Sequence, residues 1–286
     1  MIEWLNTVLQ GVMLGGLYAL FAMGLSLMFG VMRLTNVAHG DFIILMAFAA
    51  YAAIASLGMT LSLLLLLPLA FAIGYGLQRG VLNGTLGNNP LPSLVVTFGL
   101  SIVIQNLLQE IFSADTRSIS AMGIETKSFQ LAENIYIGVL PLIIFAVAVA
   151  AAFAMQWLFG NTALGRAFRA TSDDKEAAQL MGLDHRHVYG LATAIAFVLI
   201  AIAGVLQGMR TTIAPADGPG LLLYAFEAVI IGGMGSFWGT FSGAIILGVA
   251  QAIGFRLDPG WGILVGHVVF LAMLIVRPNG LFPKTK

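Results

Sequence analysis

The chain has 286 residues, of which 59% are hydrophobic and only 9% are charged. Soluble domains carry about a quarter charged residues, so this composition predicts a polytopic transmembrane bundle of the all-α class. The 13 basic and 13 acidic side chains balance, which argues against nucleic-acid binding, and the absence of cysteine excludes disulfides and thiolate chemistry.

Nine apolar runs, each bounded by charged or turn residues, are candidates for spanning helices, which need about 20 residues. The second, fourth, seventh and ninth runs are short, so we expect about eight or nine spans with some helices broken or re-entrant. Because no Ser/Pro-rich linker interrupts the chain, a single transmembrane domain over 1–286 is predicted. The runs are 7–32, 42–57, 61–77, 94–109, 135–159, 188–209, 221–233, 238–255 and 261–276.

The distribution of lysine and arginine between alternate loops predicts the orientation. If all nine runs cross, one side receives nine basic residues and the other four. The richer side is expected to be cytoplasmic, which places the N-terminus outside and the C-terminus and the loop 161–187 inside. The loop 110–134 is then external. Glu3 stands where a signal peptide would carry a basic residue, so the first run is interpreted as an uncleaved span.

Small residues recur at helical spacing in two of the runs. One row is formed by Gly11, Gly15 and Ala19, and the other by Gly235 and Gly239, continuing to Gly243. Such rows let helix backbones approach each other closely within a bilayer. We therefore predict tight helix packing at both rows, and an approach of backbone to a transported ligand is the alternative.

A polar segment, 36–41, separates the first two runs. In one interpretation it is a turn in which Asp41 caps the next helix. In the other it is the break of a discontinuous helix, with Asn36, His39 and freed backbone groups lining a transport path. The residues alone leave both interpretations open.

The stretch 165–187 is a polar island that holds eight of the 26 charged residues. Thr162 or Asn161 is expected to cap a first short helix that runs through residue 170. A capping box of Asp173 and Glu176 is expected to open a second short helix, over 174–181. Gly182 would then end it in the left-handed conformation, and Asp184 would cap the next span.

The second short helix is predicted to be amphipathic. Helical spacing places Ala177, Leu180 and Met181 on one face, while charged side chains point elsewhere. A small apolar face on a charged projection is what docking into a groove of a soluble partner requires.

Two ionisable residues lie within later runs. Glu227 is expected to face the bundle interior or a cavity, where it would meet a substrate's ammonium group; the alternative is a position near the interface. His267 is expected to make an interhelical hydrogen bond. The chain contains no phosphate-binding loop and no metal-like histidine cluster, so neither ATP binding nor any cofactor is predicted.

Several motifs resemble those of a known family. Glu176, Ala177 and Ala178, followed by Gly182, match the EAA loop of ABC importer permeases, whose coupling helix docks on an ATPase. The whole pattern is similar to the permease subunits of branched-chain amino acid ABC importers, in particular the first of the two permeases that such systems pair. The segments that carry this resemblance are 36–41, 96–101, 105–106, 165–170 and 231–236.

The resemblance implies a prokaryotic inner-membrane subunit that works with a second permease, two ABC ATPases and an extracytoplasmic binding protein. Relatives that carry urea, amides or aromatic acids are an alternative, and an ion-coupled secondary transporter is a more distant one. The implied coupling residues are Arg166, Arg169, Asp173, Glu176, Ala177, Ala178, Leu180, Met181 and Gly182. The candidate path residues are Asn36, His39, Asp41, Thr97, Glu227, Gly232 and Gly233.

Overall fold

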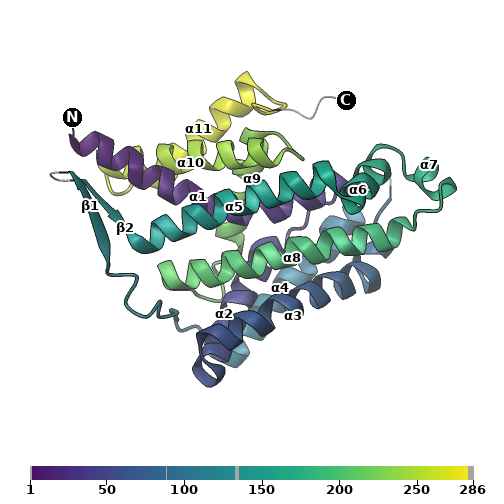
Figure 1. The fold of residues 1–286 in the computed structure, drawn as a ribbon, viewed down its shortest axis with the longest axis horizontal. Helices are drawn as coiled ribbons and strands as arrows, with labels where there is room; N and C mark the ends of the chain where they lie inside the picture. The colour runs from purple at the N-terminus through teal and green to yellow at the C-terminus, as the bar shows by residue number, and fades with distance from the viewer. Residues whose placement is uncertain (1, 88, 133–134, 283–286) are drawn as a thin grey trace.

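The computed structural model describes residues 2–87, 89–132 and 135–282, and each of the nine apolar runs contains a helix (Figure 1). Two short helices, α6 and α7, lie in the polar island as predicted. The helices are α1 (Ile2–Met32), α2 (His39–Leu57), α3 (Met59–Gly80), α4 (Leu91–Phe112), α5 (Val139–Asn161), α6 (Ala163–Asp173), α7 (Lys175–Leu180), α8 (His185–Arg210), α9 (Gly218–Gly232), α10 (Phe237–Leu257) and α11 (Gly262–Val276), with a 3-10 turn at Leu82–Gly84.

Seven of these helices are long and apolar enough to cross a membrane. The second and fourth runs, expected to be short, extend to helices of 19 and 22 residues. The seventh and ninth remain short as α9 and α11, with 15 residues each. At 1.5 Å per residue such a helix rises about 22 Å, less than the roughly 30 Å hydrocarbon core. The chain is therefore a multi-pass helical bundle with two short helices.

The fifth run corrects the sequence prediction, because its first residues form a strand. β2 (Ile135–Gly138) pairs antiparallel with β1 (Ser128–Ala132), and Phe129 lies opposite Ile137. Alternation of buried and exposed side chains over Ile-Tyr-Ile is a strand pattern, and hydropathy alone did not separate it from the helix that follows. The hairpin lies at the same end of the molecule as the N-terminus (Figure 1).

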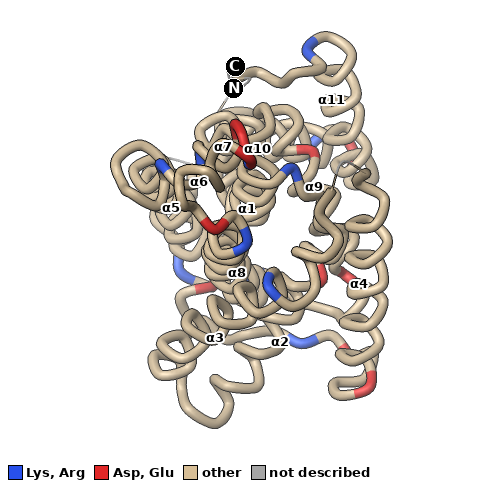
Figure 2. Tube along the Cα trace, turned by 90° about the vertical axis from the view of Figure 1, so that its right-hand side faces the viewer, with Lys and Arg blue, Asp and Glu red and all other residues tan. Residues whose placement is uncertain are grey.

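Helix α1 is central to the bundle, and α4 and α11 lie at its periphery (Figure 2). The row of small residues in α1 packs against α10. A Cβ on Gly15 would lie 2.6 Å from the Cα of Ile245, and one on Gly248 would lie 2.5 Å from the carbonyl oxygen of Gly11. No side chain fits at these distances, so the predicted close packing is confirmed for this row.

The second row is only partly helical. Gly239 and Gly243 lie in α10 and face α9, where a Cβ on Gly243 would lie 2.3 Å from the carbonyl oxygen of Ala228. Gly235 instead precedes α10, in a turn with φ of 83°. This left-handed backbone is the one glycine adopts most readily, so Gly235 serves the turn before α10. It also packs closely on α1, because a Cβ on Gly30 would lie 3.0 Å from the Cα of Gly235.

Candidate functional site

The polar island projects from the end of the bundle opposite the N-terminus (Figure 1). Thr162 caps its first helix, as one of the two predicted caps, because its Oγ1 accepts a hydrogen bond from the Gly165 nitrogen at 3.0 Å. The helix continues to Asp173, beyond the predicted end at residue 170. Phe168 packs this helix against α5: its side chain is fully buried, and its ring centroid lies 5.4 Å from that of Phe159.

The predicted capping box at Asp173 is wrong by one residue. Asp173 is the last helical residue of α6, whereas Asp174 has an extended backbone with φ of −148°. Oδ1 of Asp174 accepts hydrogen bonds from the nitrogens of Glu176 and Ala177, both at 2.9 Å. Asp173, which was predicted to cap α7, is therefore the last residue of α6. The cap of α7 is the next residue, Asp174.

The end of the second helix follows the prediction. Gly182 has φ of 85°, and the Leu183 nitrogen returns to the carbonyl oxygen of Ala178 at 3.0 Å. Asp184 then caps α8 by accepting from the Arg186 nitrogen at 2.9 Å. Although desolvation opposes it, hydrogen bonding from backbone N–H groups and the nearby Arg79 lower the pKa of Asp184 below its usual value.

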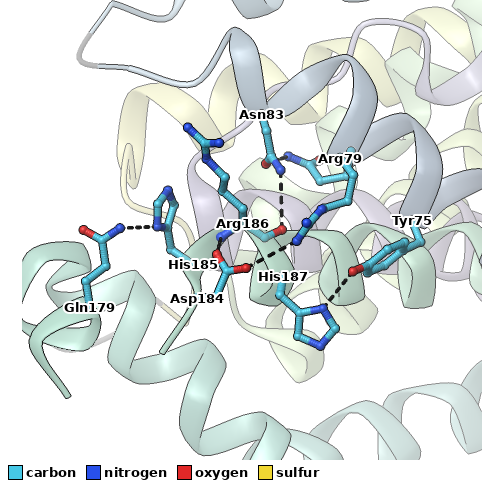
Figure 3. A network of polar contacts seen from close by, with 9 residues as sticks. Tyr75, Arg79, Asn83, Gln179, Asp184, His185, Arg186 and His187 are labelled. Atoms are coloured by element: carbon cyan, nitrogen blue, oxygen red, sulfur yellow. Dashed lines mark hydrogen bonds and ion pairs between the residues drawn. The ribbon is translucent and has the colours of Figure 1, made fainter. Parts of the chain in front are cut away.

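Polar contacts tie this loop to α3 and α8 (Figure 3). The two histidines of the loop, His185 and His187, have different partners. His185 contacts Gln179 and His187 contacts Tyr75. The distances are 3.3 Å for Arg79–Asp184, 2.8 Å for Tyr75–His187, 3.4 Å for Asn83 to the Arg186 carbonyl and 2.5 Å for Gln179–His185.

The apolar side chains of the second helix face solvent. Leu180 is 88% exposed and Met181 is 84% exposed, with Ala177 exposed beside them. Ala178, on the same helix, is buried. Arg166 is exposed on α6. The structure therefore shows an apolar pair, Leu180 and Met181, held on a short capped helix, which we call the docking pair.

The segment between α1 and α2 contradicts the interpretation in which Asp41 caps the second helix. α2 begins at His39, so Asp41 lies in its first turn and does not cap it. Asn36 takes the role of an acceptor instead, since its Oδ1 binds the Ala38 nitrogen at 3.1 Å. Oδ1 of Asp41 accepts from Gln105 on α4 at 2.9 Å. The segment separates two helices, which both interpretations require, so the structure contradicts only the proposed cap at Asp41.

Four candidate path residues meet at this break. Oγ1 of Thr97 on α4 accepts from the Val37 nitrogen at 3.1 Å, and the His39 Nε2 lies 2.8 Å from the carbonyl oxygen of Phe21 on α1. Asn36, His39, Asp41 and Thr97 are all 1% exposed or less. In this conformation the chain encloses them, so a role in lining the path stays a prediction.

The other path candidates lie apart from this cluster. Glu227 on α9 is 2% exposed, and its Oε1 lies 2.5 Å from Nδ1 of His267 on α11, which confirms the predicted interhelical hydrogen bond. Gly232 and Gly233 form the turn towards α10. A Cβ on Gly232 would lie 2.1 Å from the carbonyl oxygen of Gly239, so this glycine permits helix packing.

One polar group was missed by sequence reasoning. The Tyr18 hydroxyl donates to Oε1 of the buried Gln251 at 2.6 Å, and the rings of Tyr18 and Tyr224 stack with centroids 4.8 Å apart. These side chains are uncharged at neutral pH, so the pattern of charged residues within apolar runs does not indicate them. A glutamine in an otherwise apolar run, at position 251, was the available signal.

Together, the multi-pass bundle and the projecting capped loop define a polytopic α-helical membrane protein. Comparison of the sequence with known families specifies this further. The chain belongs to the family described as "Branched-chain amino acid transport system / permease component", whose model matches residues 7–277.

Individual relatives agree with the family. The chain is 29% identical to the high-affinity branched-chain amino acid transport system permease protein BraD of Pseudomonas aeruginosa, with 98% of this chain and 95% of BraD covered. It is 27% identical to LivH of Escherichia coli, with 97% and 95% covered. The solved structure of PsaBC from Streptococcus pneumoniae shares the fold, with a TM-score of 0.52, 13% identity, and 98% of this chain and 97% of that chain covered.

Proposed function

We propose that the chain is one of two permease subunits of an ATP-driven importer for branched-chain or similar amino acids. The observation that carries this proposal is the docking pair, in which Leu180 and Met181 face solvent at the end of a capped helix. Exposed apolar side chains of this kind fit a groove on a soluble partner. The names of the relatives supply the substrate class.

The proposed complex contains a second permease, two ABC ATPases that hydrolyse ATP and an extracytoplasmic binding protein. The whole chain, 1–286, is one transmembrane domain, and the loop 161–187 docks on the ATPases. The bias of nine basic residues against four supports a cytoplasmic loop and C-terminus with the N-terminus outside. The position of the docking loop opposite the N-terminus fits this orientation (Figure 1).

The contacts of the loop provide a route by which ATPase motion reaches the bundle. Asp184 and Arg79 join it to α3, and the Ser172 hydroxyl of α6 donates to the carbonyl oxygen of Gly30 on α1 at 2.8 Å. Gly30 lies just before the break between α1 and α2. Movement of α6 and α7 is thereby linked to the interrupted segment, which is a candidate two-state element.

The substrate path is proposed to use the cluster at this break, with Asn36, His39, Asp41 and Thr97. Three buried polar atoms support this, because they have no hydrogen-bond partner in the part of the chain that the structure describes: Nδ1 of His39, Oδ2 of Asp41 and Nδ2 of Asn36. Such atoms are costly in a closed bundle and become satisfied when water or substrate enters. Glu227, Gly232 and Gly233 are proposed to border the path through α9.

The docking assignment is tested by a double variant, Leu180→Asp with Met181→Asp, in the reconstituted complex. We expect loss of ATPase co-purification and of uptake, because two carboxylates would enter an apolar groove. Met122→Asp is the matched control, since Met122 is 72% exposed but lies in the loop that precedes β1. Unchanged ATPase association in the double variant would refute the assignment. Glu176→Lys tests the charged side of the same helix.

Substrate class is tested on the partner binding protein. Thermal shift with leucine, isoleucine, valine, urea and an aromatic acid should show stabilisation by the branched-chain amino acids, because ligand binding to the native state raises its stability. Stabilisation by urea or the aromatic acid alone would favour the alternative substrates. Uptake that needs an ion gradient and no ATPase would favour a secondary transporter.

A further inference from the structure

A polar cavity of about 640 Å³ opens among the ends of α1, α8 and α10. Contacts place it at the end of the bundle that carries the N-terminus and the hairpin. Arg256 of α10 pairs with Glu3, and the Gln10 side chain, which lines the cavity, donates to the Tyr136 carbonyl of β2 at 2.9 Å. Its volume lies within the roughly 300–1,000 Å³ of small-molecule sites.

Two arginines line this cavity, and they differ in their partners. Arg256 is paired with Glu3, and its guanidinium lies 5.2 Å from the ring centroid of Trp4. Arg210, at the end of α8, has no carboxylate partner and no side-chain hydrogen bond within residues 2–87, 89–132 and 135–282. A cation at the end of a membrane helix is expected to find an anion, so Arg210 marks where a ligand's negative charge would bind.

Further polar atoms around the cavity lack partners. Gln251 is 1% exposed, and while its Oε1 accepts from Tyr18, its Nε2 has no partner among the described residues. The buried Oδ1 of Asn6 is likewise without a donor there. Buried polar groups are nearly always satisfied in folded proteins. Arg210 thus lines the cavity, and two buried amide atoms of lining residues, Nε2 of Gln251 and Oδ1 of Asn6, have no hydrogen-bond partner among the described residues.

A second cavity, between α10 and α11, provides an internal comparison. It has about 430 Å³ and is lined only by aliphatic side chains, among them Ile245, Val249 and Val265. That surface suits an acyl chain or another helix. The cavity at Arg210 differs because its lining is mixed: charged and amide groups lie beside the apolar side chains of Leu14, Phe255 and Ile263.

We propose that the cavity at Arg210 is an entry site on the permease for a small zwitterion with an aliphatic side chain. The carboxylate pairs with the guanidinium of Arg210, whose planar fork matches it, and the ammonium binds Oδ1 of Asn6. The aliphatic group packs on Phe255 and Ile263. This deepens the proposed function, on which it rests, by assigning residues that recognise the substrate after its release from the binding protein.

The test uses the complete complex in phosphatidylcholine nanodiscs without binding protein. Saturation-transfer difference NMR should detect leucine but not leucinol, which lacks the carboxylate. Arg210→Gln should raise the Kd for leucine about tenfold, since a charge-assisted pair is lost, and Arg210→Lys should give an intermediate value. Arg277→Gln is the control, and we expect a Kd close to that of the wild type because Arg277 is exposed after α11 and does not line the cavity.

Three outcomes would overturn the site. One is equal binding of leucine and leucinol by the wild type; this comparison does not depend on the folding of any variant. The second is an unchanged Kd in Arg210→Gln. The third is displacement of leucine by phosphatidylglycerol or inorganic phosphate, which would assign the cavity to a lipid headgroup or a free anion.

Uptake of leucine with the binding protein present separates this site from the proposed function. If the wild type imports leucine while Arg210→Gln binds it as tightly as the wild type, the site is refuted and the function stands. If the wild type imports no leucine but its binding still depends on Arg210, the function is refuted and the site stands.

Discussion

Three pairs of polar side chains join different parts of this apolar chain. Glu227 meets His267 across α9 and α11, Tyr18 meets Gln251 across α1 and α10, and Asp184 joins Arg79 at the surface. In the first two pairs Glu227, Tyr18 and Gln251 are buried, whereas His267 is partly exposed, so breaking either pair leaves a buried polar group. The third is exposed, so its role lies in the position of the docking loop more than in stability.

Asp184 allows its two contacts to be separated. Asp184→Ala should destabilise the start of α8 by about 1 kcal/mol through loss of the cap, whereas Asp184→Asn should retain the cap and lose only the charge contact with Arg79. Thermal unfolding of the detergent-purified chain measures both. Equal destabilisation by the two variants would show that charge and not the cap matters.

The same residue gives a pH dependence with a defined sign. Its pKa is lowered in the folded state, so its carboxylate contributes stability above the unfolded-state pKa. That contribution is lost as the pH falls through the folded-state pKa. Asp184→Asn should therefore narrow the difference between the thermal midpoints at neutral and acidic pH. An unchanged difference would exclude Asp184 as a source of the pH dependence of stability.

Glu227 distinguishes structural from transport roles. Glu227→Gln retains an oxygen that can accept from His267 and should keep the unfolding free energy close to that of the wild type, while Glu227→Ala should cost about 1–3 kcal/mol. If Glu227 meets the substrate's ammonium group, Glu227→Gln should nevertheless reduce uptake. Normal uptake by a stable Glu227→Gln variant would leave the residue with a structural role alone.

At the scale of elements, hydropathy predicted all nine apolar helices because each is bounded by charge or turns. The errors fall where neighbouring elements compete for the same residues. Asp173 is the last residue of α6, so Asp174 and not Asp173 caps α7. Ile135, which was predicted to begin a helix, lies in strand β2 of the hairpin. The cavity at Arg210 was not predictable, because its residues come from five helices and no local pattern connects them.

The α1–α10 interface gives a prediction at this scale. Gly248→Ala should destabilise the bundle by about 1–3 kcal/mol, because the new Cβ would lie 2.5 Å from backbone atoms of Gly11 and Gly15. Gly76→Ala is the control, since nothing lies within 4 Å of its Cβ, and alanine is the better helix former. Thermal unfolding of both variants measures the difference. Equal stability of Gly248→Ala and Gly76→Ala would mean that the α1–α10 interface accommodates the new methyl group without loss of stability.

At the scale of the whole molecule, the two ends carry different kinds of site. One end presents the docking pair and its network, and the other contains the polar cavity, with the broken segment between α1 and α2 enclosed by the bundle. A transporter that alternates between two open states requires such a separation, because energy enters at one end and substrate at the other. The network in Figure 3 is therefore expected to affect coupling more than folding.

Arg79→Met tests that expectation by removing the contact between α3 and Asp184 while leaving the docking pair intact. An exposed ion pair is worth up to about 1 kcal/mol, so stability should change little, but a coupling loss of that size would lower the substrate transported per ATP up to about fivefold. Arg186→Met is the matched control, since the Arg186 side chain makes no ion pair within the described residues. ATPase co-purification should be normal in both variants. A normal ratio of uptake to hydrolysis in Arg79→Met would mean that motion reaches the bundle through α6 and α8 alone.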